Sequence, residues 1–284
     1  MAPSPLFSVI IPTYNRRVHL EAAVKTILKQ DYDSFEVVVV NNNCTDGSGE
    51  LLDEMALADS RLRHVHEPVQ GLNPARNTGL KEARGEIVAY FDDDELAPTS
   101  WLSNLAGCYE ATGATGVGGS YRSIWDGAPP RWLQNSECFK EMLGVCTFSR
   151  KREQAEWLVG GNCSYRREAL EEVGGFGSFV GYVGGKSSAD GADVALGYRL
   201  GRAGHELWYE PEAYVFHKIL RARQSLPGVL RRAFWSGYAN AMNHRAYNVR
   251  EKMRLARRRG SDAYLLGSFI LPGYLYGRAV KALR

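Results

Sequence analysis

The sequence predicts an α/β fold with a doubly wound sheet, because short apolar segments alternate with segments of helical periodicity through its first half. Three of the apolar segments have the length of buried strands, and polar residues follow each of them. These three expected strands are Phe7 to Ile11, Glu36 to Val40 and Glu86 to Phe91. A chain of 284 residues, 44% of them hydrophobic, is long enough to bury the core of such a domain.

The segments between the expected strands have helical features. Val18 to Gln30 places its apolar residues on one stripe, and a second helix is expected over Gly49 to Ala58. A short strand is expected at Leu62 to His66. The next helix is expected to begin at Pro74, where a missing N–H costs nothing, and to end at Gly85.

The pattern weakens from about Thr115 into Gly-rich and aromatic segments that indicate loops. A helix is expected over Ala192 to Ala203, followed by two strands, His205 to Tyr209 and Ala213 to Phe216. Together with the first half, these elements complete a single doubly wound, mixed sheet. Residues 1–218 are therefore expected to form one α/β domain, and residues 219–284 a helical C-terminal extension.

The predicted C-terminal extension is strongly basic. Residues 219–284 contain 14 Lys or Arg and 2 Asp or Glu, whereas the preceding 218 residues contain 21 basic and 30 acidic residues. Such a segment favours an anionic partner, which the sequence leaves open as a membrane surface, a lipid pyrophosphate or nucleic acid. The apolar stretch Ala263 to Gly277 is too short to span a bilayer and is broken by Pro272, but it could lie on one.

One helix of the extension has an apolar side with arginines beside it. Two hypotheses stay open for this helix: it docks on an anionic membrane, or it packs on the catalytic domain. The apolar side consists of Phe234, Trp235, Tyr238 and Met242, and the arginines are Arg231, Arg232 and Arg245.

Cysteine usage and the N-terminus bear on the compartment. The five cysteines form no CxxC pair, so they indicate neither a zinc site nor a disulfide framework. No basic and apolar leader of the secretory type follows Met1. We therefore expect a cytoplasmic protein, with the basic extension as the surface that would contact the inner face of a membrane.

The sharpest chemical feature is the run Asp92-Asp93-Asp94, which directly follows an expected strand. Polar clusters also follow the other two strands, at Thr13 to Asn15 and at Asn41 to Asn43, and ligands of doubly wound sheets bind at these strand ends. Three adjacent carboxylates repel one another, and Mn²⁺ or Mg²⁺ prefers such oxygen ligands. The alternative is a solvated acidic turn.

The order of the motifs resembles family 2 glycosyltransferases, whose fold is called GT-A and whose aspartate cluster is called the DxD motif. The resemblance runs from about residue 7 to residue 217. It is carried by the segments Phe7 to Arg16, Val40 to Ser48, Asn73 to Leu80, Tyr90 to Asp94, Gly174 to Phe176, Gly191 to Leu200 and Val215 to His217.

This resemblance implies an inverting transferase that moves a sugar from a nucleoside-diphosphate donor to a hydroxyl acceptor, in the synthesis of a polysaccharide, glycolipid or other glycoconjugate. It implies a Rossmann-like GT-A domain with Mn²⁺ or Mg²⁺ as cofactor. Residues 1–114 would bind the nucleotide and residues 115–218 the acceptor. No nucleic acid partner is implied.

The resemblance also implies roles for single residues. Asp94 would be the main metal ligand, His217 would lie near the same metal or the phosphates, and Asp193 would be the general base. Tyr14 would stack on the nucleobase, Arg76 would lie near the diphosphate, and Asp92 and Asp93 near the ribose. The full set implied for the nucleotide is Pro12, Thr13, Tyr14, Asn15, Asn42, Arg76, Asp92 and Asp93. For Tyr14, Arg76, Asp193 and His217, a purely structural role is the alternative.

Two departures from the family pattern keep other readings open. Asn41 and Asn42 replace the usual acidic residues, which leaves the donor base open among uridine, thymidine and guanosine. Ala192 replaces a usual Glu, so Asp193 is the expected base and Asp190 the substitute. The alternatives are a nucleotidyltransferase, which the absence of a Gly-rich loop with a following Lys near the N-terminus disfavours, and a non-catalytic nucleotide-sugar-binding protein.

Overall fold

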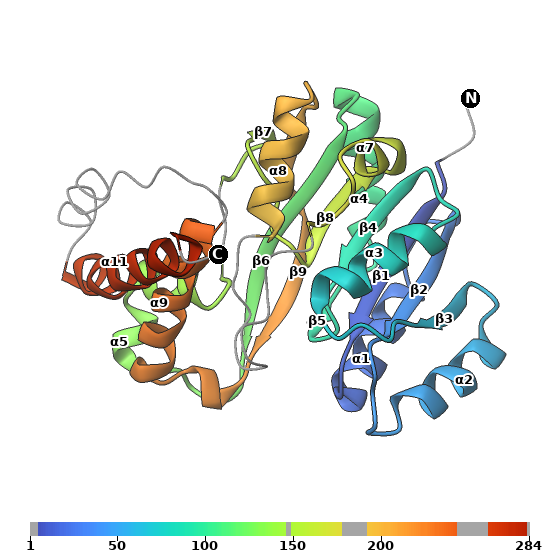
Figure 1. Cartoon of the computed structure of the whole chain (residues 1–284). Coiled ribbons are helices and arrows are strands. Elements are labelled where there is room, and N and C mark those ends of the chain that lie inside the picture. Colours follow the sequence, from blue (N-terminus) through green and yellow to red (C-terminus); the bar gives the residue numbers. More distant parts are fainter. Residues whose placement is uncertain (1–4, 146–148, 178–191, 243–260, 283–284) are drawn as a thin grey trace. The chain divides into compact units, whose positions relative to one another are not determined.

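A computed structural model describes residues 5–145, 149–177, 192–242 and 261–282 of the chain (Figure 1). The chain divides into two compact units. The first comprises Met1–Arg122, Thr147–Ser178 and Asp193–His217, and the second comprises Ser123–Cys146, Phe179–Ala192 and Lys218–Arg284. Residues 123–146 therefore group with the C-terminal helices, and the boundary at residue 218 remains a prediction.

A mixed sheet forms the centre of the first unit, with nine strands among the described residues. Its strand order is β3-β2-β1-β4-β8-β6-β9-β5, and β7 pairs with β9. β1, β2, β3 and β4 are parallel to their neighbours among these four, whereas β8 runs antiparallel to both β4 and β6. The strands are β1 (Phe7–Thr13), β2 (Phe35–Asn41), β3 (Leu62–His66), β4 (Ile87–Phe91), β5 (Glu95–Leu96), β6 (Gly116–Trp125), β7 (Glu153–Ala155), β8 (Asn162–Arg166) and β9 (Leu207–Ile219).

Helices cover both faces of the sheet because alternate strand residues point to opposite sides. Val9 and its neighbours on one face pack with Leu20 of α1 and Trp101 of α4 in the main hydrophobic core. On the other face, Ile10 meets Gly79 of α3, which lies in front of the strands in Figure 1. The helices of this unit are α1 (Arg17–Ile27), α2 (Ser48–Ala58), α3 (Leu72–Glu82), α4 (Trp101–Thr112), α7 (Arg167–Glu172) and α8 (Ala192–Arg202).

The structure differs from the predicted secondary structure at three places described here. The two strands predicted around Pro211 are one strand, β9, in which the Pro211 carbonyl accepts a hydrogen bond from Ser120 Oγ. Helix α3 begins at Leu72 rather than at Pro74. Pro74 lies in the first turn, where N–H groups lack helical partners, so the proline is tolerated there. Strand β6 was not predicted, since its glycines hide it: a Cβ on Gly119 would lie 1.6 Å from the Ala213 carbonyl oxygen.

The second unit is helical and has its own hydrophobic core. Leu133 and Phe139, from the two short helices, pack with Val229 of α9 and Leu266 of α11. No helix in the described part of the chain is long and apolar enough to cross a membrane. The elements are α5 (Arg131–Gln134), α6 (Glu137–Met142), the 3₁₀ turn η1 (Arg221–Arg223), α9 (Leu226–Met242) and α11 (Ser261–Ala282).

Candidate functional site

The carboxyl ends of β1 and β4 meet at the aspartate cluster. These strands are parallel neighbours, so the residues that follow them lie at the same edge of the sheet. Thr13 Oγ1 donates a hydrogen bond of 2.8 Å to Asp93 Oδ2 across 80 residues of sequence. Burial, opposed by Arg16 and assisted by Asp94, raises the pKa of Asp93 to about 7.

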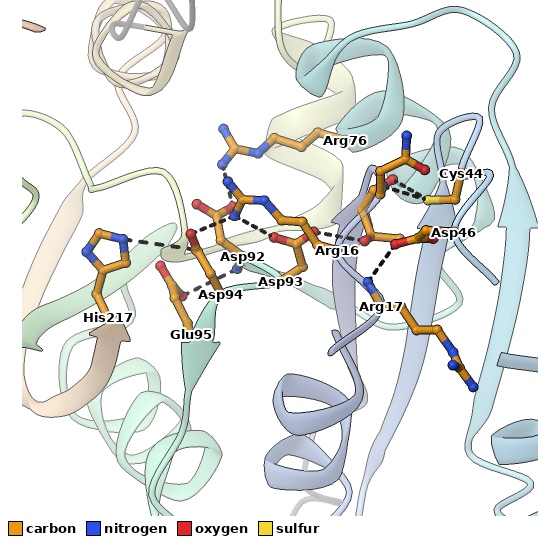
Figure 2. Close-up of polar contacts among 12 residues, drawn as sticks. Arg16, Arg17, Cys44, Asp46, Arg76, Asp92, Asp93, Asp94, Glu95 and His217 are labelled. Atoms are coloured by element: carbon orange, nitrogen blue, oxygen red, sulfur yellow. Dashed lines mark hydrogen bonds and ion pairs between the residues drawn. The ribbon is translucent and has the colours of Figure 1, made fainter. Parts of the chain in front are cut away.

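Arg16 supplies a positive charge to this cluster. Its Nη1 lies 3.1 Å from Asp93 Oδ1 and 2.6 Å from Asp94 Oδ2, as Figure 2 shows. Burial alone would lower the pKa of Arg16, but the two carboxylates raise it above its ordinary value. No role was predicted for Arg16 from the sequence, although it lies at the end of the motif Phe7 to Arg16.

Asp94 and His217 come together from different parts of the chain. β5 pairs with β9, which places Glu95 opposite His217, and His217 Nε2 lies 4.0 Å from Asp94 Oδ1 (Figure 2). The side chains of Asp94 and His217 are about one-tenth exposed. Asp94 and His217, which were predicted as metal ligands, are therefore neighbours in the structure although 123 positions separate them in the sequence.

Glu95 is a fourth carboxyl group at the same edge of the sheet, and no role was predicted for it from the sequence. It is buried, and its burial, with Asp92 and Asp94 nearby, raises its pKa well above the ordinary value. Its carboxyl group hydrogen-bonds Tyr121 and accepts a bond from the Asp92 backbone N–H. The run of acidic residues from 92 to 95 was the signal that could have identified it.

Arg76 of α3 is a buried arginine at the edge of the cluster. Its Nη2 donates to Asp92 Oδ1 at 3.1 Å and to the Gly160 carbonyl at 2.8 Å. Its guanidinium also lies 5.0 Å from the ring centroid of Phe176. Burial alone would lower the pKa of Arg76, but Asp92 raises it, so the group is a fixed cation.

Asp193 lies in the first turn of α8, next to the same loop. Its Oδ2 accepts a hydrogen bond of 3.1 Å from the Gly160 N–H, and its Oδ1 accepts one from the Val194 N–H. One residue, Gly160, therefore contacts both the Arg76 guanidinium, through its carbonyl, and Asp193, through its N–H. Asp190, the substitute base, lies outside the described residues.

Asn15 and Asn42 hold loops together at the ends of β1 and β2. Asn15 Oδ1 accepts from the Thr45 N–H at 2.7 Å, and Asn15 adopts a left-handed conformation with φ of 52°. Asn42 donates from Nδ2 to the carbonyls of Glu67 and Val69, and its Oδ1 accepts from the Gly71 N–H. Both asparagine amides therefore shape the loops into which a base would fit.

Tyr14, by contrast, is available to a ligand. It follows the buried residues Pro12 and Thr13 at the end of β1, and 47% of its surface is exposed. Aromatic side chains that are exposed at a ligand edge can stack on a planar group.

The cluster suits a divalent cation on chemical grounds. Asp92, Asp93 and Asp94 provide three adjacent carboxylates, which the guanidinium groups of Arg16 and Arg76 contact. Mn²⁺ accepts both carboxylate oxygen and imidazole nitrogen, and a cation that binds a diphosphate needs few protein ligands. No group of three or more metal-ligating side chains occurs in the described residues, so Asp94 and His217 would share the ion with substrate oxygens.

Comparisons with known proteins show which family and fold the chain resembles. The family model described as glycosyl transferase family 2 matches residues 8–174. A glucosyl-dolichyl phosphate glucuronosyltransferase from Haloferax volcanii is 28% identical over 238 residues, which cover 82% of this chain and 75% of that protein. A GalNAc(5)-diNAcBac-PP-undecaprenol beta-1,3-glucosyltransferase from Campylobacter jejuni is 37% identical over 103 residues, covering 36% of this chain and 33% of the relative.

A solved structure has the same fold. The mannosyltransferase from Pyrobaculum calidifontis, determined in complex with GDP-Man and Mn²⁺, superposes with a TM-score of 0.63 and 23% identity, over 99% of this chain and 76% of that one. Three further curated relatives are matched over only 30 to 50% of their own length. The GT-A fold expected from the sequence is therefore confirmed.

Proposed function

The chain belongs to glycosyl transferase family 2, and from this membership and its site we propose that it transfers a sugar from a nucleoside-diphosphate donor to an acceptor hydroxyl with inversion. Two observations support the proposal: His217 approaches Asp94, and Gly160 contacts both Asp193 and Arg76, which in turn contacts Asp92. The family match also argues against the nucleotidyltransferase alternative.

Donor binding is assigned to the loops that follow β1, β2 and β4. Tyr14 would stack on the nucleobase, while Asn15 and Asn42 hold the neighbouring loops in place. Asp92 and Asp93 would lie beside the ribose. The Pyrobaculum relative binds GDP-Man, which makes a guanosine donor one of those to test first.

The metal is assigned to Asp94 and His217. When bound, Mn²⁺ or Mg²⁺ supplies positive charge that stabilises the departing diphosphate. Arg16, which holds Asp93 and Asp94 in the structure, can remain beside the diphosphate as a second cation. The Pyrobaculum structure contains Mn²⁺, and this supports trying that ion before others.

Asp193 is assigned as the general base. Inversion is a single displacement, which requires one carboxylate to accept the proton of the acceptor hydroxyl and no nucleophile from the enzyme. Two backbone N–H groups, of Gly160 and Val194, donate hydrogen bonds to the two oxygens of the Asp193 carboxylate and so help to fix its orientation.

A lipid-linked acceptor at a membrane surface is part of the proposal. The names of the Haloferax and Campylobacter relatives specify polyprenyl-linked saccharides. The basic residues of 219–284 would attract the anionic surface on which such an acceptor lies.

Turnover tests the proposal. UDP-, dTDP- and GDP-sugars are each supplied with Mn²⁺ and with glycosylated polyprenyl phosphates, and release of the diphosphate is measured. We expect one donor to be consumed, chelation of the metal to stop the reaction, and an α-linked donor to give a β-linked product. A chain that binds a donor but never turns it over with any acceptor would instead support the non-catalytic alternative. Retention of the anomeric configuration would contradict Asp193 as base.

A further inference from the structure

The outer face of helix α11 is apolar and exposed. Exposed fractions of Leu265, Phe269, Leu275 and Tyr276 lie between 36% and 58%. Leu265, Phe269, Pro272 and Leu275 are all exposed and follow one another at intervals of four, three and three residues. This spacing places them on one side of the helix, along about 15 Å at 1.5 Å per residue.

The opposite face of α11 is occupied by α9. Ala263, Leu266 and Tyr274 of α11 are buried. The two helices touch through backbone at a pair of glycines: a Cβ on Gly237 of α9 would lie 1.9 Å from the Ile270 carbonyl oxygen, and one on Gly273 of α11 would lie 1.8 Å from that of Phe234. These contacts fix the rotation of α11, so its apolar stripe cannot turn inward.

The packing of α9 shows whether its apolar side can contact a membrane. Tyr238 is buried, and the rings of Phe234 and Trp235 pack against each other within the α9–α11 pair. The apolar side of α9 therefore packs on a neighbouring helix, α11, and is not free to dock. Arg245 and the side chain of Met242 lie outside the described part. An exposed apolar face is found instead on α11. This segment was expected to lie on a bilayer, but the residues that would contact the bilayer were not predicted.

A helix that is apolar on both sides favours a second apolar neighbour. Arg278 is the one charged side chain of α11 that the structure describes. A helix with an exposed apolar side can lie in the plane of a lipid surface, with that side toward the acyl chains.

Charge decides between a membrane and a second copy of the chain. Residues 219–284 carry a net charge of +12, from 14 basic and 2 acidic residues. A second copy would bring the same positive charge to the interface and be repelled, whereas anionic headgroups would be attracted. The combination of an apolar stripe with a basic surrounding sequence matches an interfacial helix.

We propose that the outer face of α11 seats on an anionic lipid surface, with the side chains of Leu265, Phe269 and Leu275 entering the boundary between headgroups and acyl chains. This inference rests on the membrane contact proposed above and specifies where it is made. It does not depend on sugar transfer, so vesicle binding and turnover can fail separately.

Vesicle co-sedimentation of the full chain tests the proposal. The probes are vesicles of phosphatidylglycerol with phosphatidylcholine, and vesicles of phosphatidylcholine alone. We expect the native chain to bind the anionic vesicles, and to bind the neutral ones more weakly. In the triple variant Leu265→Ser, Phe269→Ser and Leu275→Ser, the affinity for anionic vesicles should fall by about tenfold or more. The matched control is Val18→Ser, Leu57→Ser and Val69→Ser, three exposed apolar residues of the first unit, which should bind like the native chain.

A second variant separates apolar seating from charge attraction. Phe269→Lys adds a positive charge to the stripe, so it should bind anionic vesicles more weakly if the ring enters the lipid, and more strongly if charge alone drives binding. Stronger binding overturns the proposal, as does undiminished binding of the triple variant. A native dimer in solution that the triple variant converts to a monomer would assign the face to a second copy and also overturn it.

Discussion

Replacing Arg76 with lysine separates two roles for this residue. The structure connects Arg76 to Asp92 directly and to the proposed base Asp193 through the Gly160 peptide. The guanidinium is buried, with 3% exposure, so little of its surface is open to a diphosphate. It is therefore expected to position the base and the aspartate cluster, rather than to bind the diphosphate itself.

The expected magnitude follows from the contacts that lysine cannot reproduce. An ammonium group retains the charge but lacks the planar face that lies over the Phe176 ring, and it cannot keep the same two-acceptor geometry. Loss of one charge-assisted hydrogen bond costs about 1.5–3 kcal/mol. If that loss appears in the transition state, kcat falls by about 10- to 150-fold. The diphosphate affinity should stay within about threefold, which is under 1 kcal/mol.

The assay measures kcat and the diphosphate Kd of Arg76→Lys side by side. Arg199→Lys is the matched control. Arg199 also donates two hydrogen bonds to main-chain carbonyls, but these belong to Val173 and Gly175 and not to the residues of the site. We expect the control to keep its kcat. A parallel loss of affinity and kcat in Arg76→Lys would show that Arg76 binds the diphosphate, and an equal kcat loss in Arg199→Lys would show general loosening of the fold.

Three further substitutions address the base, the metal and the nucleotide loop. Asp193→Asn should lower kcat by about 10²–10⁴-fold while diphosphate binding persists, and unchanged kcat would remove Asp193 from the mechanism. Asp94→Ala should abolish activity together with the Mn²⁺ requirement, so Mn²⁺-dependent turnover in this variant would contradict the metal assignment. Asn42→Asp should lower the free energy of unfolding in urea by about 2–4 kcal/mol, because a carboxylate cannot donate to the Glu67 and Val69 carbonyls; an unchanged urea midpoint would show that the loop tolerates their loss.

The sequence predicted the elements whose burial leaves a local pattern. β1, β2 and β4 are buried on both faces, so each reads as a continuous apolar run and was placed within one or two residues. The convergence of their polar ends was also predictable, since carboxyl ends of neighbouring parallel strands lie at one edge. The Thr13–Asp93 hydrogen bond is the direct result.

Features set by distant contacts were not predictable from local pattern. The glycines of β6 suggested loops, yet Gly119 is required because the backbone of β9 passes against it. The Asn42 departure from the acidic family pattern looked like a change in base preference, whereas in the structure Asn42 donates to two carbonyls of a loop 25 and 27 residues away. Likewise, only tertiary packing decides that α9 turns its apolar side to α11.

Ligand-dependent thermal unfolding of the full chain tests the central claim most directly. The unfolding midpoint is measured with UDP, dTDP, GDP, CDP and ADP, each with Mn²⁺ and with a chelator, for the native chain and for Asp94→Ala. A ligand at about 100 times its Kd stabilises the folded state by about 2.7 kcal/mol, so one diphosphate should raise the native midpoint, only with Mn²⁺, and fail to do so in the variant. If no diphosphate raises the midpoint in the presence of Mn²⁺, the site does not bind a nucleotide-sugar donor and the proposed function is wrong.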